Sequence, residues 1–167
     1  MKTITRMVPV LVAAAACCAT TLAAQHQDEL GKAVTSARVP LERGLAASAS
    51  HGQPISGKFE MEDGHLQLSV YTAKDGKFSE VIVDQKTGKV ATAEPITEGE
   101  DLSAATDQNA AMAMAKVSLR AAVQQALRTN PGFRAVSVVP SLKDGRAVAD
   151  VRLAKGAEFK SIAVPLR

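Results

Sequence analysis

The sequence has few aromatic residues and few cysteines, and each shortage narrows what the protein can do. Its 167 residues include no Trp, one Tyr and four Phe, so stacking of bases or sugars on aromatic side chains has little to work with. The chain is 46% hydrophobic and 22% charged, with a formal net charge of +3, which is ordinary for a globular protein and argues against disorder. Beyond the N-terminal segment, no stretch approaches the roughly 20 apolar residues of a transmembrane helix, so we expect no membrane span.

The first 24 residues have the pattern of a targeting segment, and they contain both cysteines. Lys2 and Arg6 precede an apolar run over residues 7–16, and small residues follow as far as Ala24. A basic start, a short apolar stretch and a small-residue cleavage site predict a secretory signal peptide over residues 1–24. We therefore expect a periplasmic or secreted protein whose mature chain has no cysteine, no disulfide and no thiolate metal site.

A lipoprotein signal is the alternative interpretation of the same segment. In that case Ala14–Ala16 would form the lipobox, and a lipid anchor would be attached at Cys17. Bacterial lipoboxes usually carry Leu three residues before the cysteine, where this chain has Ala14. The exported form without a lipid anchor is therefore favoured.

Charge is distributed unevenly along the chain. Residues 25–107 carry 8 basic and 14 acidic side chains, whereas residues 108–167 carry 10 basic and 3 acidic side chains. Two parts of opposite charge either attract each other or face different partners. A nucleic-acid partner is not expected, because so few aromatic residues accompany the Arg and Lys residues.

The two parts also share a pattern, which indicates an internal repeat. Val39–Leu45 and Val117–Val123 lie 78 residues apart, and each begins a helical pattern. Asp-Gly pairs at 63–64 and 144–145 lie 81 residues apart. Small loop insertions between two similar units would produce this drift.

Each unit is predicted to begin with a helix. In the second unit one helical face is apolar, with Leu119, Val123, Ala126 and Leu127 at helical spacing. Ser118 is placed to cap this helix, and Asn130–Gly132 ends it. In the first unit Leu41 and Leu45 play the same part, although Gly44 costs on the order of 1 kcal/mol relative to Ala. An earlier helical stretch is expected to begin at Asp28.

Strands follow each helix, because apolar residues then alternate with polar ones. The expected strands cover residues 55–61, 66–71, 78–83, a short run around 90, and then 135–139, 147–153 and 159–164. Asp-Gly pairs such as Asp63-Gly64 and Asp75-Gly76 predict tight hairpin turns. Residues 94–107 contain five acidic side chains, Pro95 and Gly99, and predict a linker. Residues 110–115 are expected to extend the second helix.

These elements predict an α+β fold of two helix-plus-antiparallel-meander units that pack together. The first unit covers residues 25–93, the acidic linker residues 94–107, and the second unit residues 108–167. Units of this size are small for independent stability, which is why we expect them to share an interface.

The first unit resembles the PepSY domain family. The resemblance rests on Val39–Glu42, Glu62–Gly64, Asp75–Lys77 and above all Val83–Val90, which looks like that family's terminal Asp-x-x-Thr-Gly turn. In this chain the turn residues are Asp84, Thr87 and Gly88. They also have a local structural explanation, because an Asp side chain can accept bonds from nearby backbone N–H groups and Gly allows a left-handed exit.

The second unit matches the helix, its Asn-Pro-Gly end and the strands, but it lacks the terminal turn. It stops at Ala163–Arg167, so it resembles a degenerate copy. PepSY domains occur in propeptides of thermolysin-like metalloproteases and in exported bacterial proteins. The resemblance implies a module that binds or restrains a peptidase, with no catalytic residue.

The residues themselves offer little chemistry, and we do not expect an enzyme, a cofactor or a dedicated metal site. The predicted mature chain has three histidines, His26, His51 and His65, and no zinc-ligand spacing. Glu60, Glu62, Asp63 and His65 could form a weak site for a hard cation. A solvated acidic edge is the favoured interpretation of this group.

Two features remain as candidate binding surfaces. Arg120, Gln124 and Arg128 form a basic stripe on the second helix, for which a solvated helix face is the alternative. The edges of the sheet can accept an extended peptide as an added strand. We expect an exported, non-catalytic protein-binding module that binds or inhibits a peptidase. The alternatives are a structural or sensory envelope scaffold and a weak metal- or ligand-binding periplasmic protein.

Overall fold

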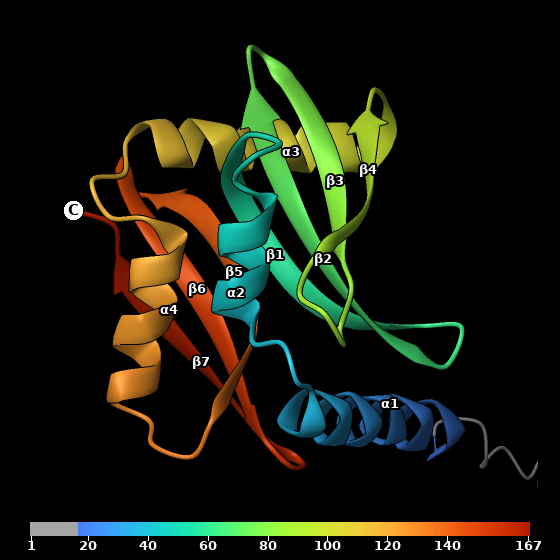
Figure 1. Ribbon diagram of the computed structural model, residues 1–167. Coiled ribbons are helices and arrows are strands. Elements are labelled where there is room, and N and C mark those ends of the chain that lie inside the picture. The colour runs from blue at the N-terminus through green and yellow to red at the C-terminus, as the bar shows by residue number, and fades with distance from the viewer. Residues whose placement is uncertain (1–16) are drawn as a thin grey trace, which may run out of the picture.

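The computed structural model describes residues 17–167, which fold into four helices and a seven-stranded antiparallel sheet (Figure 1). The predicted α+β class is therefore confirmed. The helices are α1 (Cys17–Ser36), α2 (Leu41–Ser48), α3 (Gly99–Ala113) and α4 (Leu119–Arg128). The strands are β1 (Gln53–Glu62), β2 (His65–Lys74), β3 (Lys77–Val83), β4 (Val90–Ile96), β5 (Arg134–Lys143), β6 (Arg146–Lys155) and β7 (Glu158–Pro165).

The strands form one continuous sheet in the order β4-β3-β2-β1-β5-β6-β7. Each of β1–β4 pairs with its neighbour in sequence, and so does each of β5–β7. The two meanders meet where β1 pairs with β5, at Gly57 with Val138 and Lys58 with Ser137. This arrangement leaves β4 and β7 as the two outer strands.

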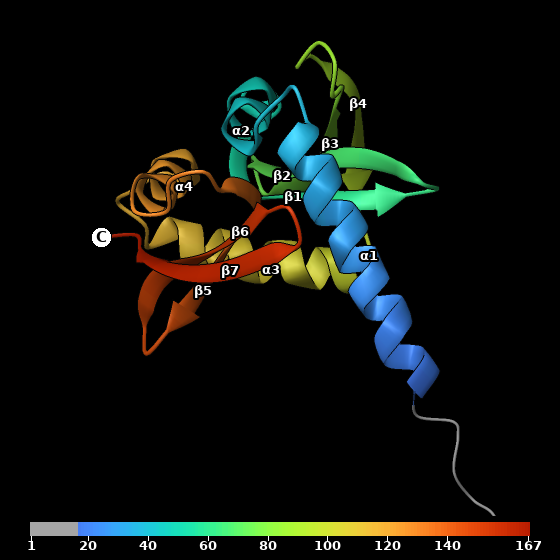
Figure 2. The same cartoon turned by 90° about the horizontal axis from the view of Figure 1, so that it is seen from below.

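Helices cover both faces of the sheet. Figure 2 shows α2 and α4 on one face and α3 on the other. α2 and α4 contact each other above the sheet, while α3 contacts β5 and β1, the two strands where the meanders meet. The centre of the sheet is therefore buried from both sides, and even Ser69 and Thr72 of β2 are inaccessible to solvent.

The first helix lies across one end of the sheet (Figure 1). Val34 is fully buried, and the Thr35 hydroxyl accepts a hydrogen bond of 3.2 Å from the N–H of Gly156 in the β6–β7 turn. Gly31 allows this close approach, because a Cβ atom there would lie 2.0 Å from the Gly156 carbonyl oxygen. The helical stretch predicted from Asp28 is part of this helix.

Most of the predicted signal peptide lies outside the described residues, which begin at Cys17. Its cleavage site and the alternative lipid attachment stay predictions. No helix in the described part of the chain is long and apolar enough to cross a membrane.

The predictions for the connecting segment need correction. Residues 94–107 do not form an irregular linker: they end β4 and form most of α3. Pro95 is tolerated because β4 is an edge strand, and Glu100 and Asp101 in the first turn of α3 suit the positive end of the helix dipole. Residues 110–115 do not extend α4 either. They end α3, and a short loop carries the chain to the opposite face of the sheet.

The local predictions for turns and caps are confirmed. Asp63, Asp75 and Asp144 have positive φ angles of 47°, 52° and 51°, and each is followed by a glycine that also has positive φ. The Ser118 hydroxyl accepts a 3.2 Å hydrogen bond from the N–H of Ala121 and so caps α4. Gly132, with φ of 83°, follows the end of that helix.

Candidate binding surfaces

The predicted basic stripe lies on the solvent face of α4. Arg120, Gln124 and Arg128 are all exposed, whereas Leu119 and Val123 on the other face are buried in the core. Within the described part of the chain, neither arginine forms an ion pair. The structure brings the three residues together as expected. Their use as a partner surface stays a prediction.

A cavity of about 250 Å³ lies between α2 and α4, next to this stripe. It is lined by Leu45, Ala46, Ala49, Gln53, Pro54, Met112, Ser118, Leu119 and Arg120. Most of these side chains are apolar, and Arg120 is the one that carries a charge. The stripe therefore divides: Arg120 belongs to the rim of the cavity, and Gln124 and Arg128 lie beyond it.

A second cavity, of about 200 Å³, lies between α3 and the sheet. Ser56, Lys58 and Tyr71 of the sheet face Asp101 and Gln108 of α3 across it. The Ser56 hydroxyl donates a 2.6 Å hydrogen bond to Oε1 of Gln108, which ties β1 to α3. The sequence analysis did not identify this cavity, because it did not predict α3.

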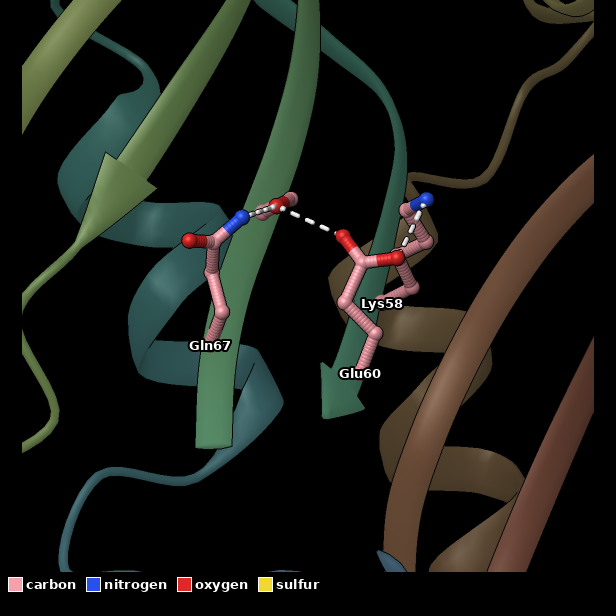
Figure 3. A network of polar contacts seen from close by, with 4 residues as sticks. Lys58, Glu60 and Gln67 are labelled. Atoms are coloured by element: carbon pink, nitrogen blue, oxygen red, sulfur yellow. Dashed lines mark hydrogen bonds and ion pairs between the residues drawn. The ribbon is translucent and has the colours of Figure 1, made fainter. Parts of the chain in front are cut away.

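A chain of polar contacts continues from Lys58 across β1 and β2 (Figure 3). Lys58 Nζ lies 2.7 Å from Oε2 of Glu60, and Glu60 Oε1 accepts a 3.2 Å hydrogen bond from the Ser69 hydroxyl. Gln67 Nε2 donates in turn to the Ser69 hydroxyl oxygen over 3.2 Å. Glu60 is thus held by a cation and a hydroxyl on the face of the sheet that α3 partly covers.

Lys58 also lies near the only tyrosine of the chain, with its Nζ 5.6 Å from the centre of the Tyr71 ring. Burial raises the pKa of Tyr71, and the charge of Lys58 opposes this rise. Burial lowers the pKa of Lys58, but the hydrogen bond to Glu60 and the charges of Tyr71 and Glu60 outweigh it, so the net shift is upward. At neutral pH the pair therefore supplies a cation and a phenol O–H donor.

The predicted signature turn is built as a local hydrogen-bonded unit. Asp84 Oδ1 accepts bonds from the Thr87 N–H and the Thr87 hydroxyl, both of 2.7 Å, and from the Lys86 N–H at 3.1 Å. These bonds, first of all the one from the Thr87 hydroxyl, lower the pKa of Asp84. Gly88 takes a positive φ of 71° directly beside Arg43, which donates to the Thr87 carbonyl oxygen over 3.4 Å. The turn thus connects the β3–β4 loop to α2.

The structure does not assemble the weak cation site that the acidic residues suggested. His26, His51 and His65 are all exposed, and Glu60 is engaged by Lys58 and Ser69. Among the residues that the structure describes, no group of three or more His, Cys, Asp or Glu side chains is arranged to hold a metal ion.

The outer strand β4 is the most exposed strand of the sheet. Residues 91–95 are all solvent-exposed, and β4 pairs with β3 alone. Beside its C-terminal end lies a polar cavity of about 210 Å³. Four carboxylates line it: Glu80, Glu94, Glu98 and Asp101.

Comparison with known proteins finds no relative: no family model, no curated protein and no solved structure matches this chain. The resemblance to the PepSY family therefore rests on the residues of the chain alone. The binding role must be argued from the surfaces described above.

Proposed function

We propose that this protein is an exported, non-catalytic module of two PepSY-like units that binds a peptidase and inhibits it. The arrangement of the sheet supports the two units, because β1 and β5 each begin a meander and the two meanders extend outward from their shared border. The short helices α2 and α4, which precede these strands, lie on the same face. The peptidase as partner is what the family resemblance implies.

The exposed edge of β4 is the observation that carries this proposal. An edge strand presents unpaired N–H and C=O groups, and an extended segment of another protein can add to it as a further strand. The inner edges of the two meanders, β1 and β5, are used to join them, whereas β4 stays open. An inhibitory contact then consists of main-chain hydrogen bonds between β4 and a loop of the peptidase.

The acidic cavity beside β4 gives this contact a preference for charge. An added strand would place some of its side chains over Glu80 and Glu94, which are paired across β3 and β4 on one face of the sheet. Glu98 and Asp101 extend the same negative surface. We therefore expect the bound segment to carry a Lys or Arg residue.

A titration of proteolytic activity tests the proposal. The purified chain is added in increasing amounts to the peptidase activity of the exported fraction of the cell of origin. We expect a saturable loss of activity near an equal molar ratio. Intact activity at a large excess of the chain would contradict inhibition.

Charge-reversed variants locate the surface. Glu94→Lys should shift the titration to higher concentrations, because it places a cation beside the incoming basic segment. Glu158→Lys is the matched control, since it makes the same change on β7, the other outer strand. Equal effects of the two substitutions would argue against β4 as the binding edge.

A further inference from the structure

The cavity between α2 and α4 has an apolar floor built from three separate helices. Leu45 of α2, Met112 near the end of α3 and Leu119 of α4 line it, with exposed fractions of 2%, 6% and 2%. Around them Ala46, Ala49 and Pro54 leave the space open, because their side chains are short. An aliphatic group placed here would be removed from water on several sides, which is favourable in proportion to the area buried.

The rim of this cavity supplies groups that bind an anion. Arg120 is the single charged residue among those that line the cavity, and it forms no ion pair within the part of the chain that the structure describes. Gln53 and Ser118 stand on the same rim and add an amide and a hydroxyl. A guanidinium group is well matched to a carboxylate, to which it can donate two parallel hydrogen bonds.

We propose that this cavity binds a short- to medium-chain aliphatic carboxylate. Its chain lies over Leu45, Met112 and Leu119, and its carboxylate is bound by Arg120. The volume of about 250 Å³ is below the roughly 300–1,000 Å³ of pockets for drug-sized ligands, so a chain of a few carbons fits better than a large ring system. The site is separate from β4, and its occupancy does not depend on the proposed function.

Calorimetric titration of the full chain with a series of sodium carboxylates tests this site. From butanoate through hexanoate to octanoate, we expect the affinity to rise about fourfold per added methylene until the cavity is full. Octanol has the chain but no charge, and we expect it to bind at least about tenfold more weakly than octanoate. Octanol that binds as tightly as octanoate, or octanoate that gives no saturable heat, would overturn the proposal.

Three variants separate the role of the charge from that of the cavity. Arg120→Gln should weaken octanoate binding by about tenfold or more and leave octanol unchanged. Arg128→Gln, two turns further along the same exposed face, should change neither. Ala46→Leu, which keeps a good helix former in α2, should fill the cavity and remove binding of both ligands. Equal losses from the Arg120 and Arg128 substitutions would overturn the assignment of Arg120. Thermal unfolding of each variant, compared with the parent chain, verifies that it is folded.

Discussion

At the scale of single residues, Asp84 shows how a short motif fixes a turn. Its carboxylate accepts three hydrogen bonds from the two residues Lys86 and Thr87, and Gly88 then provides the left-handed conformation that lets the chain return to β4. The sequence pattern predicts this geometry because every contact is local. What the motif explains directly is structure, and its link to a family stays a prediction.

The Asp84 turn makes stability depend on pH. Since hydrogen bonds lower the pKa of Asp84 in the folded state, its ionised form stabilises the fold above the unfolded pKa of about 3.9, and this contribution is lost as the pH falls through the folded value. Asp84→Asn should lower the urea midpoint near neutral pH, and the difference from the parent chain should shrink below pH about 4. Asp75→Asn, at an exposed hairpin turn, is the control for the change of charge. A difference that stays constant with pH would contradict this account.

The environment of Tyr71 gives a second prediction, which is easy to read because the chain has one Tyr and no Trp. The charge of Lys58 opposes the upward shift that burial causes in the pKa of Tyr71. Lys58→Met should therefore raise that pKa further, as followed by the ultraviolet absorbance of tyrosinate during an alkaline titration. Lys74→Met, at the exposed end of the same strand, should leave it unchanged. A fall in the Tyr71 pKa in the Lys58 variant would refute the assigned contact.

At the scale of elements, Gly44 shows how packing can oppose helix propensity. Gly44 is unfavourable inside a helix, yet a Cβ atom there would lie 2.5 Å from Cδ2 of Leu68, which is fully buried in β2. Gly44 thus lets α2 lie close to the sheet. The cost in helix propensity, about 1 kcal/mol, is smaller than the 1–3 kcal/mol typical of overpacking a core.

Gly44→Ala is therefore expected to destabilise the protein by about 1 kcal/mol, despite its better helix propensity. Urea unfolding measures this change. In a Leu68→Ala background the clash is absent, and the same substitution should be neutral or stabilising. If Gly44→Ala costs the same in both backgrounds, close packing against Leu68 is not the reason for this glycine.

The strands, the hairpins and α4 could be predicted from the sequence, because their signals are local: alternation with period two, Asp-Gly turns and the Ser118 cap. The third helix could not. Pro95, Gly99 and a run of carboxylates are typical of a loop, while α3 is stabilised by the burial of Ala105, Ala111 and Met112 against other parts of the fold. Both cavities are lined in part by α3, so they were out of reach as well.

At the scale of the whole molecule, the border between β1 and β5 could not be predicted, since strand order depends on contacts between residues about 80 positions apart. Only two residue pairs join these strands, but α2 contacts α4 on one face and α3 crosses the border on the other. The acidic and basic parts of the chain are thereby combined in one core.

This shared core predicts a single cooperative unfolding transition. Far-ultraviolet circular dichroism reports on all elements, whereas the absorbance of Tyr71 reports on the first meander alone, and the two thermal transitions should coincide. Gly44→Ala should shift both together, by about 2–4 °C per kcal/mol for a chain of this size. Two separate transitions would show that residues 25–93 and 108–167 unfold independently.

The central claim, that β4 receives a strand from a peptidase, is tested most directly by hydrogen exchange. The chain is compared alone and with a saturating amount of a thermolysin-type metallopeptidase that is kept inactive by an active-site inhibitor. We expect the amides of residues 91–94 in β4 to exchange more slowly in the complex, and those of Glu158–Pro165 in β7 to exchange as before. Unchanged exchange in β4, or protection confined to other elements, would contradict strand addition at this edge.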